Sequence, residues 1–460
     1  MVLAAGVLVA GFLAFSFAYA GTWKVEGEVV APWLGYLNTH YVPFERLLSG
    51  ALWLFVVVEL CAGRLGEPLD RFHPAVRTLV TSFAAGLMFY VLRDTTIALG
   101  DGPSLVRDPQ GAVITGGYYT FVEELVGMWL PLRIARMYLT EGRSPVAAIV
   151  LGYRVVSIAF GMLYVGTVAT FVRRVAAPRL AALLLLSHAA MLMFMGYVEN
   201  YVGAFALLAV GFLIAIPRLS SGTLTPRHTL AVTALFALAA MFHGVAVWAV
   251  FSLVLLAFAT NTERAGWTGR ARVIVANVAL GLGIIVGVYL LFRYYVTPGV
   301  GPVHLEPLVG ESRRPNPFAN SWEELGQIRP VHEHALALLR VGAPSLLVFL
   351  AAIAASPRQV LAVFKGRDVH FALLFLLGFL VHQLVWRSGL GIYRDWDLFA
   401  FTTLPLVYLA TRVVALLPRH PAIYGLVFGS CVLAGLSWSL AQSAAPFPAC
   451  ESGARPWGDS

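Results

Sequence analysis

The chain has 460 residues, of which 59% are hydrophobic and only 12% are Asp, Glu, Lys or Arg. In soluble domains about a quarter of all residues are charged, so this composition excludes an ordinary soluble protein and is typical of a polytopic helical membrane protein. The formal net charge is +8, but the basic residues are spread over the ends of loops, which gives no reason to expect nucleic acid as a partner.

Apolar stretches follow one another along almost the whole chain. Crossing a bilayer takes about 20 apolar residues of helix, because a backbone polar group in hydrocarbon must find its partner within its own segment. We predict about thirteen spans, at residues 3–20, 46–62, 77–97, 146–171, 180–197, 201–217, 228–242, 244–260, 273–295, 335–355, 370–386, 398–416 and 422–442. The predicted fold class is therefore all-α, a polytopic bundle of transmembrane helices.

One stretch leaves the number of crossings open. Residues 228–260 are too long for one crossing of about 30 Å and somewhat short for two, at a helical rise of about 1.5 Å per residue. We interpret the stretch as a hairpin that turns near His243 and Gly244. A single span there would invert the orientation of everything that follows.

No soluble domain interrupts the spans, and we divide the chain into three parts. Residues 1–76 form an N-terminal pair of helices, residues 77–442 form the main transmembrane domain, and residues 443–460 form a tail. The Ala-Tyr-Ala sequence at 18–20 resembles a signal-peptidase site, but no basic residues precede the apolar run, so we expect a retained helix.

The distribution of arginine and lysine predicts the orientation, because cytoplasmic loops retain these residues. One set of loops is short, basic and nearly free of acids. It holds Arg64, Arg71, Arg77, Arg173, Arg174, Arg179, Arg218, Arg227, Arg264, Arg270, Arg272, Arg358, Lys365, Arg367, Arg412 and Arg419. The other set includes two long segments, 98–144 and 296–334, in which basic residues are mixed with acids and histidines. We place the N-terminus in the cytoplasm and the two long segments outside, together with the tail.

The first long segment has an amphipathic part. Residues 118–140 mix aromatic residues, leucine and methionine with two glutamates and two arginines, which suits helices lying in the membrane interface. Pro131 is expected to split them. A loop packed on the bundle is an equally good interpretation.

Asp101 follows the third span in the sequence Leu-Gly-Asp-Gly, and Arg93 lies one to two turns earlier. Glycine on both sides of Asp101 lets the backbone turn sharply and leaves the carboxylate accessible to a ligand. The alternative is an aspartate that only forms a turn.

Glu199 lies in a hinge between two spans, where almost no loop remains. Tyr197, Asn200 and Tyr201 surround it, and a carboxylate, an amide and two phenols at the membrane surface are costly to place without partners. Asn200 has an alternative interpretation as a helix cap. We find no such structural explanation for Glu199.

Histidines occur at several span ends. His243 occupies the hinge of the next hairpin, and His332 and His334 end the second long segment. Two residues at i and i+2 do not share a helix face, so we expect polar or phosphate contacts at His332 and His334 in preference to a metal. His188 and His382 lie within spans and are expected to find partners on neighbouring helices.

The densest motif is Tyr-Arg-Asp-Trp-Asp, between the eleventh and twelfth predicted spans. Asp395 and Asp397 flank Trp396, and Arg394 suits an ion pair or a bidentate contact with an anionic ligand. Capping by Asp397 and an interfacial Trp396 are the structural alternative. In the predicted topology this motif lies on the same side as Asp101, Glu199, His243, His332 and His334.

A site of carboxylates, arginines and aromatic residues at the outer face suits an anionic lipid-linked sugar, because arginine holds phosphate, aromatic rings stack on sugars and a carboxylate activates a hydroxyl. The motifs LGDG, GYVENY, the HEH stretch and YRDWDLF, in this order over about residues 77–416, are similar to uncharacterised bacterial membrane proteins. The chain resembles the GT-C superfamily of integral-membrane glycosyltransferases, which take sugars from polyprenyl-phosphate or related carriers.

The resemblance implies that Asp101 matches the catalytic acid of the first large outer loop and that residues 112–142 match the interfacial helices after it. Asp101 would be the general base, while Glu199 and Asp395 or Asp397 would orient sugar hydroxyls or support the base. Arg394, Arg313 or Arg314 would neutralise the departing phosphate. Arg313 and Arg314 also have an interpretation as a solvated charge pair.

The resemblance implies a multi-pass protein of the bacterial cytoplasmic membrane, with an extracytoplasmic active site. Its partners would be membrane lipids, a lipid-linked sugar donor and an acceptor glycan, lipid or protein, and a divalent cation with oxygen ligands stays open. Two other hypotheses remain. The first is a transporter or lipid flippase, and the second is a noncatalytic subunit of a membrane complex.

Overall fold

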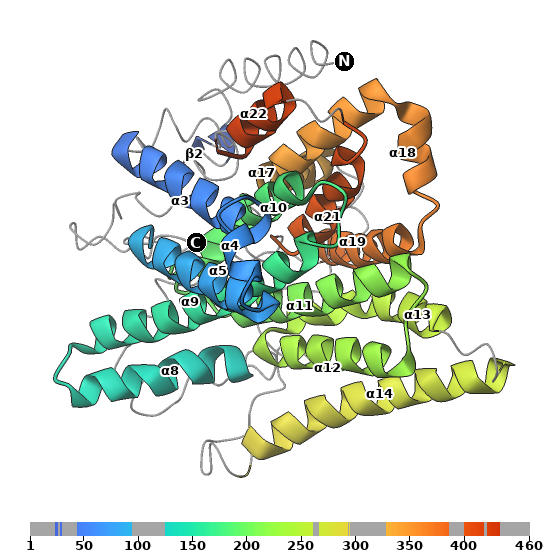
Figure 1. Cartoon of the computed structure of the whole chain (residues 1–460). Helices are drawn as coiled ribbons and strands as arrows, with labels where there is room; N and C mark the ends of the chain where they lie inside the picture. Colours follow the sequence, from blue (N-terminus) through green and yellow to red (C-terminus); the bar gives the residue numbers. More distant parts are fainter. Residues whose placement is uncertain are drawn as a thin grey trace.

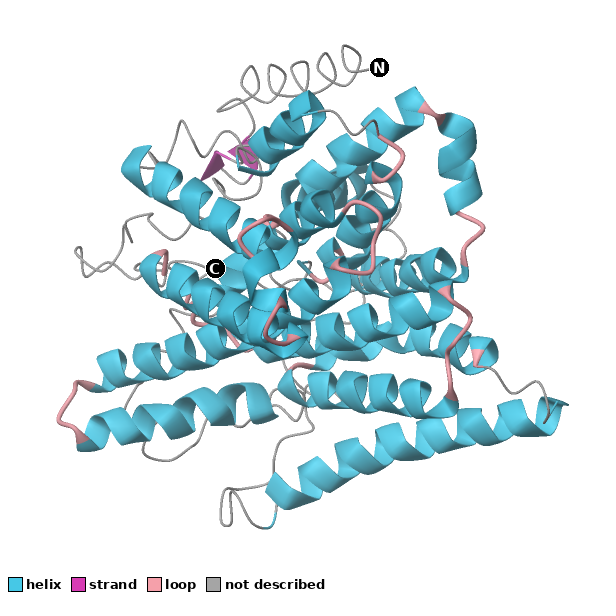
Figure 2. Ribbon diagram, in the orientation of Figure 1, coloured by secondary structure: helices cyan, strands magenta, loops and turns pink. Residues whose placement is uncertain are grey.

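The computed structural model of the chain describes residues 24–25, 28–29, 44–93, 125–260, 266–292, 294, 328–385, 400–417 and 421–432. Helices dominate this part of the chain, and the exception is a small antiparallel hairpin of strands β1 (Lys24–Val25) and β2 (Glu28–Val29) (Figures 1 and 2). The helices are α3 (Phe44–Ala62), α4 (Glu67–Asp70), α5 (Pro74–Val91), α8 (Leu125–Thr140), α9 (Pro145–Val172), α10 (Pro178–Leu186), η2 (Ala189–Phe194), α11 (Tyr201–Ser220), α12 (Pro226–Phe242), η3 (Gly244–Ala249), α13 (Val250–Ala259), α14 (Gly266–Leu291), α17 (Ile328–Ala355), α18 (Pro357–Val363), α19 (Arg367–Val385), α21 (Thr403–Val414) and α22 (Pro421–Ser430).

The described helices indicate a membrane protein. Six segments are long and apolar enough to cross a bilayer: Leu47–Asp70, Pro74–Val91, Pro145–Val172, Tyr201–Ser220, Gly266–Leu291 and Arg367–Leu384. The apolar helices at 226–242, 244–259, 344–355 and 403–414 are shorter. The predicted span 3–20 and the tail 443–460 lie outside the described residues, so the number of thirteen crossings stays a prediction.

Burial separates a central helix from a peripheral one. In α11, 72% of the apolar stretch that could cross the membrane is buried inside the protein, and the helix packs against α9, α12 and α19 (Figure 1). In α14 the buried share is only 11%, and Val275, Leu282 and Val286 are exposed. An apolar helix with so much exposed surface suits lipid as its surroundings. Aromatic rings fill the space beside α11, where Phe212 contacts both Phe371 and Phe375 of α19.

The reversal of the chain predicted near His243 and Gly244 is confirmed, while two membrane crossings within residues 228–260 stay a prediction. His243 adopts an extended conformation with φ −158° and ψ 132°, which ends α12 and starts η3. At the other end of the hairpin the hydroxyls of Thr229 and Thr260 are 2.8 Å apart, so the start of α12 lies beside the end of α13. The chain therefore reverses at His243.

The predicted continuous helix over 180–197 is wrong. α10 ends at Leu186, and a 3-10 helix, η2, follows from Ala189. Tyr164 of α9 explains the break, because its hydroxyl donates to the Leu185 carbonyl at 2.6 Å and also contacts His188 Nε2 at 2.9 Å. A side chain of a neighbouring helix thus replaces the backbone partner that a continuing helix would have supplied. The expected partner of His188 on a neighbouring helix is confirmed.

The prediction that Pro131 splits the amphipathic segment is also wrong for the described part. α8 is one helix with Pro131 inside it, and it runs beside α9 (Figure 1). Gly152 of α9 allows the close contact, since a Cβ there would lie 2.2 Å from the Pro131 carbonyl oxygen. Packing against α9 therefore compensates for the hydrogen bond that proline cannot donate.

Two polar networks tie the helix ends that carry the arginines. We call this end of the bundle, near Arg173, Arg179 and Arg412, the arginine end. Buried Glu59 of α3 pairs with Arg179, with 3.0 Å between Oε1 and Nε. Asp70 pairs with Arg77 of α5, whose Nε also donates to the Leu60 carbonyl at 2.7 Å. These contacts connect α3, α5 and α10.

The second network lies between α19 and α21. Asp368 is 2% exposed, and its Oδ2 accepts a hydrogen bond from the Tyr408 hydroxyl at 2.5 Å. Arg412 Nε lies 3.0 Å from the same oxygen. A phenol and a guanidinium thus both contact the buried carboxylate, so it is not left without partners. The network fixes the register of the two helices.

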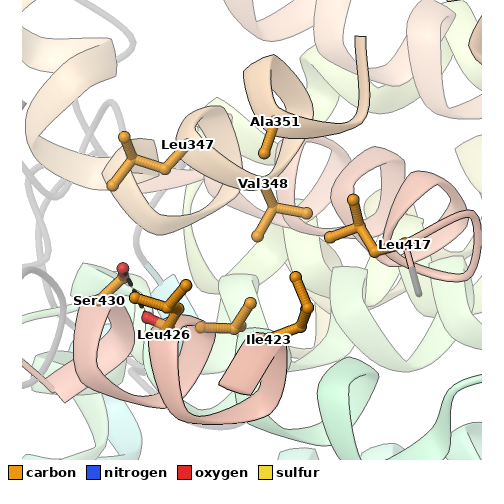
Figure 3. Close-up of a pocket in the computed structure, with 8 residues that line it drawn as sticks. Leu347, Val348, Ala351, Leu417, Ile423, Leu426 and Ser430 are labelled. Atoms are coloured by element: carbon orange, nitrogen blue, oxygen red, sulfur yellow. Dashed lines mark hydrogen bonds between the residues drawn. The ribbon is translucent and has the colours of Figure 1, made fainter. Parts of the chain in front are cut away.

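An apolar groove lies between α17, α21 and α22. Leu347, Val348 and Ala351 face Leu417, Ile423 and Leu426 across it (Figure 3). The hydroxyl of Ser430 is satisfied within its own helix by the Leu426 carbonyl at 2.8 Å. The groove therefore presents an apolar surface. Among the described residues that line it, no polar side chain lacks a hydrogen-bond partner.

We expect Gly378→Ala to destabilise the protein by about 1 to 3 kcal/mol, because overpacking forces helices apart. A Cβ at Gly378 would lie 2.1 Å from the Trp248 carbonyl oxygen, so α19 would have to move away from η3. The measurement is the thermal unfolding midpoint of the purified protein in detergent. Gly283→Ala in α14 is the matched control, since a Cβ there meets no atom within 4 Å; an equal change in both variants would contradict the close approach.

Candidate functional site

The turn between η2 and α11 carries Glu199 and is held in place from α9. Ser157 of α9 donates to the Met193 carbonyl at 2.5 Å and accepts from the Gly196 amide at 2.9 Å. Gly196 has φ +76°, a conformation that residues with a Cβ rarely adopt. The stem of Arg154 packs on it, since a Cβ at Gly196 would lie 2.8 Å from Arg154 Cγ. The turn is therefore fixed against α9 by two side chains.

Glu199 and Asn200 are each 3% exposed. The Tyr153 hydroxyl of α9 donates to Asn200 Oδ1 at 2.9 Å, and the backbone N–H of Asn200 donates to Glu199 Oε2 at 3.2 Å. Asn200 is the N-cap residue of α11 but makes no capping hydrogen bond with its side chain. The capping interpretation of Asn200 is therefore wrong for its side chain, which bonds to Tyr153. Conversely, Glu199 does have a structural contact, at the N-terminus of α11, where a negative charge is favoured.

His243 joins this group from the hairpin between α12 and η3. Its ring lies against the ring of Tyr201, with 4.1 Å between the centroids. Its Nδ1 accepts from the Val245 backbone N–H at 3.1 Å, which fixes the orientation of the ring. The neighbouring Phe242 fills the space over Gly203, where a Cβ would lie 2.1 Å from the phenyl ring.

α8 covers this group at one point. A Cβ at Gly127 would lie 2.4 Å from the Phe242 carbonyl oxygen and 3.0 Å from that of Asn200. Glycine at this position lets α8 approach the starts of α11 and η3. We call the group formed by Tyr153, Glu199, Asn200, Tyr201 and His243 the Glu199 cluster.

His382 of α19 extends the Glu199 cluster and was not among the predicted site residues. Its ring lies 5.8 Å from that of Trp248 in η3, and it is close enough to His243 for an electrostatic interaction. The sequence predicts only that His382 lies within a span. Its place in the last turn of that span could have indicated a site residue, because the last turn lies at the level of the hinges.

Only part of the predicted site falls on described residues. Glu199, Asn200, Tyr201 and His243 come together, and Tyr197 is buried in the same turn. Arg93 lies at the end of α5, where its guanidinium is 4.7 Å from the centroid of the Tyr90 ring. His332 and His334 belong to α17, but the structure does not describe their side chains. Outside the described residues lie Asp101, Arg313, Arg314, Arg394, Asp395, Trp396 and Asp397.

The chemistry of the Glu199 cluster suits a neutral, hydroxylated ligand. It combines a carboxylate and an amide, which accept and donate hydrogen bonds, with an imidazole and phenols. Among the described residues, no group of three His, Cys, Asp or Glu side chains is arranged to hold a metal ion. Comparison of the chain with protein-family models, curated protein sequences and solved structures finds no match.

Proposed function

We propose that the protein is an integral-membrane glycosyltransferase of the GT-C type, which moves a sugar from a polyprenyl-phosphate-linked donor to an acceptor hydroxyl. The observation that carries the proposal is the Glu199 cluster. It gathers a buried carboxylate, an amide, an imidazole and phenols from α9, α11 and the α12–η3 hairpin. Sugar sites in proteins combine these groups because each hydroxyl needs both a donor and an acceptor.

The arrangement of charge supports an extracytoplasmic site. The arginine end would face the cytoplasm by the positive-inside rule, and the Glu199 cluster lies at the opposite ends of α9, α11 and α12. The protein would then be a multi-pass protein of a bacterial cytoplasmic membrane. Its substrates would be a lipid-linked sugar and an acceptor glycan, lipid or protein.

The proposed reaction is a direct displacement at the anomeric carbon. The acceptor oxygen forms a bond to this carbon while the bond to the phosphate oxygen breaks, and the phosphate leaves with the electron pair. The proton of the acceptor hydroxyl goes to the Asp101 carboxylate. Glu199 and Asp395 or Asp397 orient the sugar, and Arg394, Arg313 or Arg314 neutralises the departing phosphate.

The experiment measures sugar transfer by the purified protein in lipid vesicles, with a panel of radiolabelled polyprenyl-phosphate sugars and membrane extract as the acceptor source. Asp101→Asn is expected to abolish transfer without lowering the thermal midpoint, because asparagine keeps the size of the side chain and loses the base. Asp108→Asn, in the same long segment, is the matched control and should keep full activity.

A second function is favoured by one observation, the break between α10 and η2 at buried His188. Discontinuous helices mark substrate sites in transporters, and buried ionisable groups couple ion movement there. Movement of labelled substrate across the vesicle membrane with no change in its covalent structure would favour transport. Loss of complex assembly in the variants, with no turnover in the wild type, would favour a noncatalytic subunit.

A further inference from the structure

Gln383 lies in the last turn of α19 and is 1% exposed. Neither Oε1 nor Nε2 of its amide has a hydrogen-bond partner within the described part of the chain. A buried amide without partners is unfavourable, because it has lost its hydrogen bonds to water and gained none in return. Methionine or leucine would fill the same space without this penalty.

The Gln383 amide lies on a face of α19 that is otherwise apolar. Phe379, one turn before Gln383, stacks on Phe401 with 5.3 Å between the ring centroids and 11° between the planes. Residues four apart lie on the same face of a helix, so Gln383 continues the face that Phe379 begins. The face thus changes from aromatic to amide at the end of the helix.

Gln383 follows His382 in the last turn of α19, so it lies at the level of the Glu199 cluster, although the two side chains leave different faces of the helix. The preceding residue, His382, contacts Trp248 and is in electrostatic reach of His243, whose ring lies against Tyr201. Gly378, further back in α19, holds the helix tightly against η3. The end of α19 is therefore part of the same region as His243.

The chemistry of an unpaired carboxamide narrows the class of ligand. It offers one carbonyl acceptor and one NH₂ donor side by side, which complements a hydroxyl pair on neighbouring carbons of a sugar ring. A phosphate would be better served by arginine, since the amide carries no charge. The amide therefore fits the sugar part of a lipid-linked donor.

We propose that Gln383 binds hydroxyls of the donor sugar and sets which sugar the protein accepts. This inference rests on the proposed function. A site built to hydrogen-bond a hydroxyl discriminates strongly, because a sugar that lacks the matching hydroxyl leaves the buried amide unpaired.

The test compares wild type with Gln383→Met in two measurements. The probes are polyprenyl-phosphate-linked sugars and sugar-free polyprenyl phosphate. We expect Gln383→Met to raise the KM for the preferred donor by about 10 to 100 fold. We also expect it to lose the increase in thermal midpoint that the sugar adds over polyprenyl phosphate alone. The midpoint without ligand should be unchanged or higher, because the variant removes an unpaired buried amide.

Gln359→Met, at an exposed position of α18, is the matched control and should leave the KM and both thermal shifts unchanged. Gln383→Leu repeats the test with a second apolar side chain, so that poor folding of one variant does not decide the result. If well-folded Gln383 variants keep the wild-type KM and thermal shifts, the inference is overturned, and the amide then holds only water. Sugar transfer by the wild-type protein would in that case leave the proposed function intact. Absence of both transfer and sugar-dependent stabilisation in the wild type would overturn the proposed function and this inference with it.

Discussion

Glu199→Gln is expected to lower sugar transfer by about 100-fold or more, because removal of a preorganised electrostatic contact in a buried site costs about two to three orders of magnitude in turnover. The Glu199 carboxylate is 3% exposed, and its charge is felt strongly there. Glutamine keeps an oxygen that accepts from the backbone N–H of Asn200, so the turn before α11 is retained. The measurement is kcat on the donor panel, with the thermal midpoint of the same preparation.

Glu141→Gln is the matched control for this change. Glu141 is an exposed glutamate in the turn between α8 and α9, so its neutralisation should leave both turnover and stability unchanged. Full activity in Glu199→Gln would remove Glu199 from the proposed site. A large fall in the thermal midpoint would instead assign the carboxylate to the stability of the α11 N-terminus, as the noncatalytic hypothesis requires.

Arg412→Met is expected to destabilise the protein by about 2 kcal/mol. Removing one partner of a fully buried ion pair costs about 3 to 5 kcal/mol, and the smaller value applies because the Arg412 side chain is 37% exposed. Among the described residues, the buried Asp368 carboxylate would keep only the Tyr408 hydroxyl as a partner. Chemical unfolding in detergent measures the change.

A double variant separates the loss of the ion pair from a general loss of packing. Asp368→Asn in the Arg412→Met background removes the unpaired buried charge, and asparagine still accepts from Tyr408, so at least half of the lost stability should return. Arg358→Met, at an exposed position of α18, should be neutral. No recovery in the double variant would show that Arg412 stabilises the helix pair through its aliphatic stem.

The sequence determined the helical membrane character, because apolar runs of span length leave few alternatives for a chain in lipid. It also predicted the reversal at His243, since 228–260 exceeds one crossing and the packed Thr229–Thr260 pair agrees with a hairpin. Glu199 and His243 were predicted to lie on one side of the membrane, and the structure joins their two hinges through the ring contact of Tyr201 with His243. Polar residues at hinges are costly to place, which is why the pattern was informative.

Tertiary structure alone decided which partners these residues have. Tyr153, His382 and Gln383 lie within apolar helices, and nothing in their local sequence shows which helix each one faces. The break after Leu186 depends on Tyr164 of another helix, and the continuity of α8 through Pro131 depends on a glycine in α9. Hydropathy measures the cost of leaving water, which is a local property. Hydrogen bonds and close contacts between helices depend on the path of the whole chain, so they appear only once the bundle is assembled.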